Sequence, residues 1–143
     1  MGSQTVERDA VTAAEGRRIV EEFLEASMVP DPVRARTYMA PDVVITFTGG
    51  RRFDDPAGTT AFNAARYRWV KKKFERTDVV ANTGDETIVY NIGTLYGEWP
   101  DGKPFSGNRY VDRFVVRHGK IVRMDVWNDS AELLLVRAGL ARM

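Results

Sequence analysis

Residues 107–129, GNRYVDRFVVRHGKIVRMDVWND, consist of two runs of alternating side chains on either side of His118-Gly119. A glycine supplies the positive φ angle that a tight hairpin turn requires. The side chains of a strand alternate between its two faces. In the first run, one face therefore carries five side chains: Asn108, Tyr110, Asp112, Phe114 and Val116. We therefore predict a β-hairpin with one mostly apolar, buried face.

The turn allows two registers for this hairpin. A two-residue turn at His118-Gly119 would place Asp112 directly opposite Asp125, and like charges in such a pair are unfavourable. A three-residue turn, with Gly119 as the left-handed residue of a bulge, would place Asp112 opposite Met124 instead. We therefore predict the second register.

Asp112 is the unusual residue of the apolar face, because an ionised carboxylate is costly to bury without a partner. The hairpin places no lysine or arginine on that face, so desolvation should raise the pKa of the Asp112 carboxyl. Closing the turn at residues 100–103 would set Asn91 opposite Asp112. The same pairing sets Gly93, which leaves room for a ring, opposite Tyr110. Two interpretations remain open: Asp112 is an acid or base in a pocket, or it is a structural carboxylate held by Asn91 and Tyr110.

The rest of the chain predicts helices first and strands later. Helical spacing and caps indicate four helices, over residues 12–28, 32–39, 55–73 and 129–139. Alternating runs indicate strands over residues 42–48, 77–83 and 87–99, with a short pairing over 51–54. A basic run that includes Lys71, Lys72 and Lys73 falls at the end of the third helix, where cations complement the helix dipole. This segregation is typical of an α+β fold with helices on one face of a curved antiparallel sheet.

The composition is that of an ordinary folded protein, with 143 residues, 43% of them hydrophobic and 29% charged. We expect residues 1–11 to be a polar lead-in and residues 12–143 to be a single domain. A formal net charge of +1 provides no electrostatic basis for binding nucleic acid or a membrane surface. With no cysteine and one histidine, His118 in the turn, the sequence predicts no metal site and no cofactor. No apolar run reaches the length of a membrane span, which predicts a cytoplasmic protein.

The second face of the hairpin mixes basic and apolar side chains: Arg109, Val111, Val115, Ile121 and Trp127. A tryptophan beside valine and isoleucine is too apolar to remain open to water. We therefore predict a homodimer formed through the outer face of the sheet.

This order of elements, with a strand–turn–strand that contains Asp112-Arg113-Phe114 and Gly119-Lys120-Ile121, resembles the nuclear transport factor 2-like superfamily and its SnoaL-like group. The resemblance extends from residue 12 to about residue 135. It implies a cone of helices wrapped by a curved sheet, with a pocket inside. It also implies a cofactor-independent isomerase, cyclase or hydrolase that acts on an apolar, cyclic small molecule. The alternative is a non-catalytic ligand-binding or dimeric interaction module of the same fold.

Within this resemblance, Asp112 matches the position at which ketosteroid isomerase holds a protonated aspartic acid as an oxyanion donor. The expected catalytic group is therefore Asp112, as acid–base or oxyanion donor, oriented by Tyr110 and Asn91. The base and the helix tyrosine of that isomerase fall at Phe47 and Phe23, which argues against steroid isomerase chemistry. The expected ligand-binding residues line the concave face: Phe23, Phe47, Asn108, Met124, Val126 and Asn128.

Overall fold

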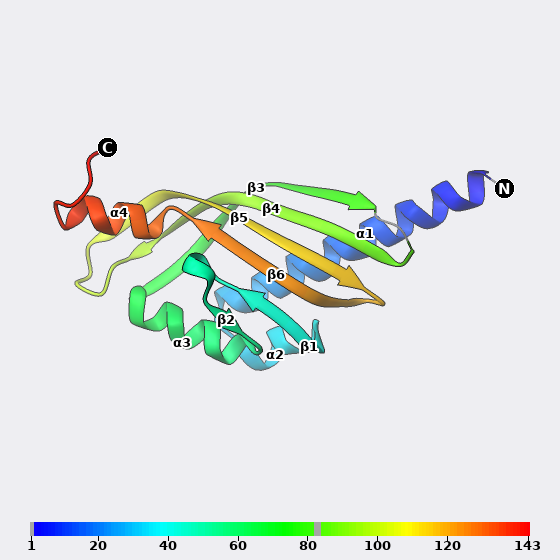
Figure 1. Cartoon of the computed structure of the whole chain (residues 1–143), viewed down its shortest axis with the longest axis horizontal. Coiled ribbons are helices and arrows are strands. Elements are labelled where there is room, and N and C mark those ends of the chain that lie inside the picture. Colours follow the sequence, from blue (N-terminus) through cyan, green and yellow to red (C-terminus); the bar gives the residue numbers. More distant parts are fainter. Residues whose placement is uncertain (1, 82–83) are drawn as a thin grey trace.

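The computed structural model describes the backbone of residues 2–81 and 84–143, and the side chains of residues 12–81 and 84–143. Helices and strands in this part of the chain follow one another as Figure 1 shows: α1 (Gly2–Met28), α2 (Pro32–Arg36), β1 (Met39–Thr46), the short helical turn η1 (Thr48–Gly50), β2 (Arg52–Phe53), α3 (Pro56–Arg66), β3 (Trp69–Ala81), β4 (Glu86–Glu98), β5 (Pro104–Arg117), β6 (Lys120–Asn128) and α4 (Ser130–Arg137).

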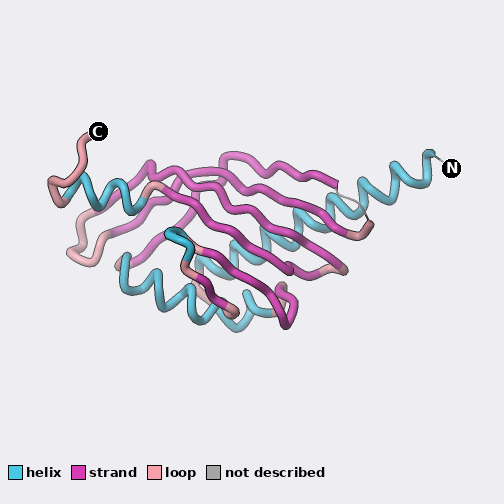
Figure 2. The backbone as a smooth tube through the Cα atoms, in the orientation of Figure 1, coloured by secondary structure: helices cyan, strands magenta, loops and turns pink. Residues whose placement is uncertain are grey.

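The strands of this part of the chain form one sheet in the order β2-β1-β6-β5-β4-β3. Neighbouring strands are antiparallel, except that β1 lies parallel to β6. Helix α1 packs against β3, β4 and β6, and α2 and α3 continue the same layer beside it (Figures 1 and 2). The α+β fold predicted from the sequence, with helices on one face of a curved sheet, is confirmed.

The core lies between α1 and the concave face of the sheet. Phe23 and Leu24 of α1 are buried, and the Phe23 ring meets Phe114 of β5 edge-on, with 5.8 Å between the ring centres. The predicted alternation along β5 is confirmed, because its inward side chains are all buried: Asn108, Tyr110, Asp112, Phe114 and Val116. This alternation places the Asp112 carboxylate inside the protein.

The turn between β5 and β6 differs from the prediction. His118 and Gly119 have φ angles of 51° and 74°, so both residues adopt the left-handed conformation. Two successive residues of this kind form a two-residue hairpin turn whose twist matches that of the strands. The turn pairs Arg117 with Lys120, and the predicted three-residue turn is therefore wrong.

A bulge in β6 prevents the pairing of Asp112 with Asp125 that a regular two-residue hairpin would produce. Val122 is the extra residue, since the pairing of β5 with β6 shifts by one position on either side of it. Beyond the bulge, Asp112 pairs with Val126 rather than with another carboxylate. Asp125 pairs with Arg113, and the nearest charged atoms of these two side chains lie 3.7 Å apart. The register thus replaces a like-charge pair with an opposite-charge pair.

The pairing of β4 with β5 confirms the predicted neighbours of the buried polar residues. Asn91 lies opposite Asp112, and Gly93 lies opposite Tyr110. Nearer the turn the register shifts by one residue at Gly107, which has a φ angle of 81°. The central pairs were therefore predicted correctly, although at the turn Pro104 pairs with Glu98 and not with Trp99.

The largest departure from the predicted elements follows α3. The sequence predicts a helix up to residue 73, whereas α3 ends at Arg66 and β3 begins at Trp69. Tyr67 ends the helix in an extended conformation, and its ring stacks on Trp99 with 5.7 Å between the ring centres. The chain then pairs with β4, because ladder hydrogen bonds and side-chain packing outweigh a weak helix preference.

The lysines of the basic run therefore lie on β3 and not at the end of a helix. Side chains alternate along the strand, so Lys72 is half-buried whereas Lys71 and Lys73 are exposed. The interpretation of this run as a complement to a helix dipole is wrong. Its consequence is that one lysine enters the interior of the fold.

Other element ends also differ from the prediction. α1 begins at Gly2, so the predicted start of this helix at residue 12 is wrong. The last two residues of the predicted strand 77–83 lie outside the described residues. Asp129 precedes α4 but makes no side-chain cap, and Asn128 Oδ1 accepts a hydrogen bond from the Ser130 backbone N–H at 3.1 Å instead.

Within residues 2–81 and 84–143, no helix is both long and apolar enough to cross a membrane. The described side chains include no group of three or more histidine, cysteine, aspartate or glutamate residues that could hold a metal ion.

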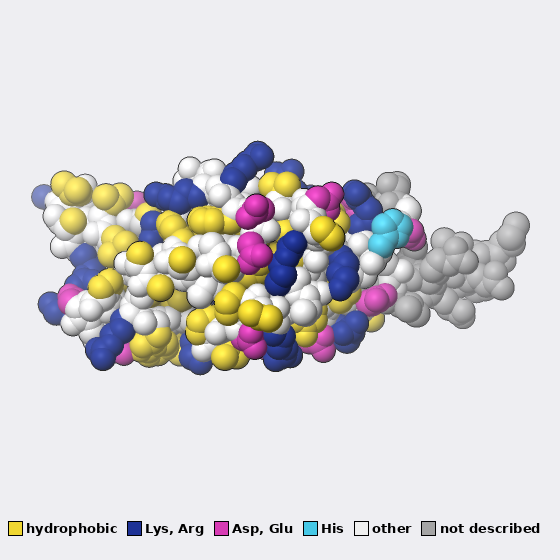
Figure 3. Space-filling model, turned by 90° about the horizontal axis from the view of Figure 1, so that it is seen from below, with side chains coloured by type: hydrophobic (Ala, Val, Ile, Leu, Met, Phe, Trp, Pro, Cys, Tyr) yellow, Lys and Arg dark blue, Asp and Glu magenta, His cyan; other side chains and the backbone are white. Residues whose placement is uncertain are grey.

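On the face shown in Figure 3, lysine and arginine side chains are dispersed among acidic and hydrophobic ones. The residues coloured there therefore form no continuous basic track of the kind that binds nucleic acid.

Candidate functional site

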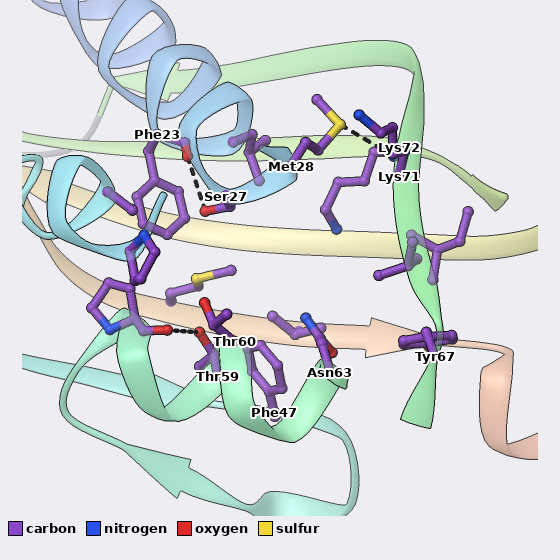
Figure 4. A pocket seen from close by; sticks show the side chains of 18 of the residues that line it. Phe23, Ser27, Met28, Phe47, Thr59, Thr60, Asn63, Tyr67, Lys71 and Lys72 are labelled. Atoms are coloured by element: carbon purple, nitrogen blue, oxygen red, sulfur yellow. Dashed lines mark hydrogen bonds between the residues drawn. The ribbon is translucent and has the colours of Figure 1, made fainter. Parts of the chain in front are cut away.

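A pocket of about 80 Å³ lies between α1, α3 and the concave face of the sheet. Figure 4 shows its side walls: Phe23, Ser27 and Met28 from α1, Thr59, Thr60 and Asn63 from α3, and Lys71 and Lys72 from β3. Ser27 and Thr59 donate their hydroxyl hydrogens to backbone carbonyls of their own helices. Thr60 and Asn63 have no side-chain hydrogen-bond partner among the described residues, so their polar groups are available to a ligand.

Lys72 connects this pocket to the buried carboxylate. Its Nζ lies 2.7 Å from Asp112 Oδ2 and 4.0 Å from the centre of the Tyr110 ring. The Lys72 side chain is 17% exposed and lines the pocket, whereas the Asp112 side chain is 0% exposed. The expectation that no lysine or arginine lies beside Asp112 is wrong, because the cation comes from β3, on the far side of β4.

The environment of Asp112 favours its protonated form. Burial raises the pKa of the Asp112 carboxyl, and the Lys72 ammonium opposes this effect only in part. Asp112 Oδ1 is buried without a hydrogen-bond partner among the described residues, which further disfavours the charged form. The direction of the shift predicted from the sequence is confirmed. A carboxyl that is readily protonated can exchange a proton with an adjacent lysine, which acid–base chemistry requires.

Tyr110 and Asn91 form a separate chain of hydrogen bonds. The Tyr110 hydroxyl donates to Asn91 Oδ1 at 2.6 Å, and Asn91 Nδ2 donates to Thr77 Oγ1 at 3.1 Å. Burial, followed by the charges of Asp112 and Glu75, raises the pKa of the Tyr110 phenol, which therefore stays neutral. Neither side chain donates to Asp112 in the described hydrogen bonds, so the predicted network around the carboxylate is wrong. Tyr110 contacts the Lys72 ammonium with its ring instead.

Most of the predicted ligand-binding residues line the pocket: Phe23, Phe47, Met124, Val126 and Asn128. Asn108 does not, because it is buried and its Nδ2 donates to Ser130 Oγ at 3.0 Å. The predicted catalytic residues lie behind the pocket wall and not in it: Asp112, Tyr110 and Asn91. Lys72 stands between them and the pocket.

The sequence matches the family model of the SnoaL-like domain over residues 20–124. The chain belongs to the SnoaL-like domain family. No curated protein matches the sequence.

Several solved structures resemble this SnoaL-like chain in fold. A nuclear transport factor 2-like protein of unknown function from Burkholderia pseudomallei is 18% identical with a TM-score of 0.67, and the match covers 84% of this chain and 95% of that one. A protein from Jannaschia named as a SnoaL-like polyketide cyclase is 17% identical with a TM-score of 0.68, over 92% and 95% of the two chains. TerC, co-crystallised with polyporic acid, is 17% identical with a TM-score of 0.65, over 84% and 95%. At sequence identities of 17% to 18%, these structural similarities establish the fold alone.

The site of this SnoaL-like chain contains two groups that sequence reasoning missed. Lys72 lies between Val70 and Phe74 in a period-two pattern, and that pattern was the available signal for a strand with Lys72 on its inner face. Tyr67 also lines the pocket, and its hydroxyl donates to Ser130 Oγ at 2.5 Å. Those two residues are 63 positions apart, so no local pattern indicates their contact.

Proposed function

We propose that this SnoaL-like protein is a cofactor-independent enzyme that acts on an apolar, cyclic small molecule through the Lys72–Asp112 pair. The observation that carries the proposal is the 2.7 Å contact between Lys72 Nζ, on the pocket wall, and Asp112 Oδ2, which is fully buried behind it. Phe23, Phe47 and Met124 provide an apolar wall that suits a ring. The co-crystal of TerC with polyporic acid supports small-molecule binding by this fold.

The expected chemistry is acid–base catalysis at a carbonyl or hydroxyl oxygen of the substrate. An ammonium in a site shielded from water stabilises the negative charge that develops on such an oxygen. Asp112 accepts a hydrogen bond from Lys72 Nζ and so orients it. If Lys72 passes a proton to the substrate oxygen, the protonated form of Asp112, which its raised pKa favours, can return a proton to the amine that remains. In this proposal Lys72 donates to the oxyanion. Asp112, Tyr110 and Asn91 lie behind the pocket wall and position the Lys72 ammonium. Isomerase, cyclase and hydrolase reactions can all use this arrangement.

A non-catalytic ligand-binding module of the same fold is the second candidate. The Lys72–Asp112 contact also fits it, because a buried ion pair can serve structure alone. The pocket volume of about 80 Å³ does not separate the two candidates, since it lies below the roughly 300 to 1,000 Å³ of most small-molecule sites, catalytic or not. In a non-catalytic module Lys72 would bind a polar group of the ligand without changing it. The ionisation of a bound phenol tests whether Lys72 stabilises an oxyanion in the pocket, which the catalytic candidate requires.

Binding of para-nitrophenol tests the proposal, because the phenol and its anion absorb at different wavelengths. We expect the bound phenol to ionise about one pH unit below the free compound, since the Lys72 ammonium favours the anion. Lys72→Met should abolish this shift, whereas Lys73→Met, at an exposed position of the same strand, should preserve it. Absorbance is measured across pH with each protein. Binding without a shift would favour the non-catalytic candidate, and a shift that survives Lys72→Met would remove Lys72 from the chemistry.

We also propose that the protein forms a homodimer through the outer face of the sheet. Trp127 is 55% exposed there and borders a shallow hollow together with Ile92 and Val111. Ile121, which was expected on this face, is fully buried in the core, because the bulge in β6 turns its side chain inward. The apolar part of the proposed contact is therefore centred on Trp127.

Trp127→Glu should convert the dimer into a monomer at micromolar concentration, because a buried, unpaired carboxylate is costly at an interface. Sedimentation velocity measures the change. Val33→Glu, at an exposed apolar position of α2 in the helical layer, is the control that should leave the dimer intact. A wild-type protein that sediments as a 16.1 kDa species would contradict the dimer.

A further inference from the structure

On helix α3, the side that lines the pocket is polar and the exposed side is apolar. Ala57, Ala61 and Ala65 recur every four residues and form the exposed side. Thr60 and Asn63 lie on the side that lines the pocket. A helix at the surface of a folded protein normally turns its apolar residues inward and its polar residues outward. The reversal indicates that the inward polar groups of α3 meet something other than an apolar core.

The side chains of Thr60 and Asn63 extend from α3 into the pocket (Figure 4). They are three positions apart, so they are neighbours on the helix surface and can bind the same group. Both are half-buried, and neither forms a side-chain hydrogen bond with any described residue. The hydroxyl of Tyr67 and the side-chain oxygen of Asn128, which belong to the same pocket, both bond to Ser130 instead. Thr60 and Asn63 therefore leave hydrogen-bonding capacity unused inside the pocket.

These two residues are not the ones that would best stabilise the helix. Threonine and asparagine have lower helix propensities than the alanine of the exposed side. A polar group in a partly buried site also lowers stability unless it is hydrogen-bonded. Because no described hydrogen bond of either side chain offsets these costs, we attribute Thr60 and Asn63 to the binding of a ligand.

The two side chains together suit a neutral hydroxyl group. An amide and a hydroxyl can each donate and accept a hydrogen bond, so they can satisfy both the hydrogen and the oxygen of a ligand hydroxyl. Neither Thr60 nor Asn63 carries a charge. Lys72, the cation that reaches the pocket from β3, bonds to Asp112 and is the group assigned above to the reacting oxygen.

We propose that the ring of the ligand carries a hydroxyl group apart from the oxygen that reacts, and that Asn63 and Thr60 bind this hydroxyl. The inference rests on the proposed function, which places the reacting oxygen at Lys72, and it adds a second point of recognition. Asn63 belongs to α3 and Lys72 to β3, so different walls of the pocket hold the two polar ends of the ligand (Figure 4). A few placed polar groups of this kind fix the orientation of a ring that apolar side chains such as Phe47 and Met124 only enclose.

Two pairs of small ring compounds test this inference: para-cresol with hydroquinone, and meta-cresol with resorcinol. Within each pair the second substituent is either a methyl or a hydroxyl group of similar size. A purely apolar pocket would bind the cresol more tightly, because a hydroxyl without a partner is costly to bury. We expect the opposite: at least one diol should bind about fivefold more tightly than its cresol, the effect of one hydrogen bond. NMR chemical-shift titration under nitrogen measures the affinities.

Variants of α3 assign the preference to its residues. Asn63→Leu replaces the amide with an apolar side chain of similar size, and it should make the cresols the tighter ligands. Thr60→Val should weaken the preference for the diol in the same direction. Ala61→Leu adds a leucine to the exposed side of the same helix and is the matched control, which should retain the preference.

Thermal unfolding without ligand tests whether Asn63 instead serves the fold. Because its amide has no described partner, Asn63→Leu should raise the midpoint by about 2 °C. A lower midpoint would show that the amide stabilises the fold, and it would overturn the inference.

The binding outcomes separate this inference from the proposed function. Equal or tighter binding of both cresols by the wild type would overturn the second point of recognition and leave the proposed function standing. Failure of all four compounds to bind would overturn the inference together with the small-molecule pocket on which the proposed function depends. A preference for the diol that survives both Asn63→Leu and Thr60→Val, or that is lost in Ala61→Leu, would contradict the assignment of the hydroxyl to these two residues.

Discussion

Lys72→Met is expected to lower the free energy of unfolding by about 3 to 5 kcal/mol at alkaline pH, the usual loss when one partner of a buried ion pair is removed. The Asp112 side chain is 0% exposed, and its Oδ1 already has no partner among the described residues. The variant therefore leaves the whole carboxyl buried without a hydrogen bond. Its pKa should rise further, because desolvation is then unopposed.

The loss should depend on pH in a definite direction. The pKa of the Asp112 carboxyl is raised in the folded protein, so the carboxyl is protonated in both states below the unfolded value of about 4. As the pH rises above that value, the unfolded chain releases its proton first, and stability falls until the folded pKa is passed. Near the unfolded pKa we therefore expect the variant to lose only about 1 kcal/mol, the contribution of one hydrogen bond.

Urea unfolding at acidic, neutral and alkaline pH measures this difference. Adding Asp112→Asn to Lys72→Met should restore most of the stability at alkaline pH, because the amide has no charge to desolvate. Lys73→Met, at an exposed position, should change stability by no more than about 0.5 kcal/mol. A Lys72→Met protein with the same stability at every pH would show that Asp112 is not the buried titrating group.

Gly93→Ala is expected to destabilise the fold by about 3 kcal/mol or more. A Cβ at this position would lie 2.0 Å from the backbone oxygen of Lys73 and 3.0 Å from the Tyr110 hydroxyl. A backbone oxygen cannot rotate away, so β3 would have to separate from β4. That movement would also displace Lys72 from Asp112, and the phenol shift described above should be lost with the stability.

Thr94→Ala is the matched control for this variant, because Thr94 is the next residue of β4 and its half-buried side chain lies on the other face. It should cost no more than about 1 kcal/mol. Thermal and urea unfolding of both variants provide the comparison. A Gly93→Ala protein as stable as the wild type would show that β3 and β4 do not approach so closely.

The sequence by itself determined the inward face of β5 and the burial of Asp112. The face on which a strand side chain lies follows from the period of the strand, which is a local property. The pairing of Asn91 with Asp112 was also predicted from the turn at residues 100–103, but it depends on the register shift at Gly107 as well, because Glu98 and not Trp99 pairs with Pro104. The order of helices and strands was enough to predict the fold class, and the structure confirms it.

The register of the last hairpin depended on more than its turn. Local chemistry at His118-Gly119 was compatible with two turns, and the repulsion between carboxylates favoured the one that is not adopted. The bulge at Val122 reconciles the two-residue turn with the pairing of Asp125 and Arg113. A bulge of this kind is selected by the packing of both strands against the core, which the turn residues do not encode.

The partner of Asp112 was decided by the tertiary structure alone. Lys72 lies 40 residues before Asp112 and reaches it across β4. Its place on a strand depends on the stacking of Tyr67 on Trp99 and on pairing with β4, which outweigh a helix preference of less than about 1 kcal/mol per residue. The cation of the candidate site was therefore hidden from sequence reasoning, because the contacts that bring it to the carboxylate join segments that are distant along the chain.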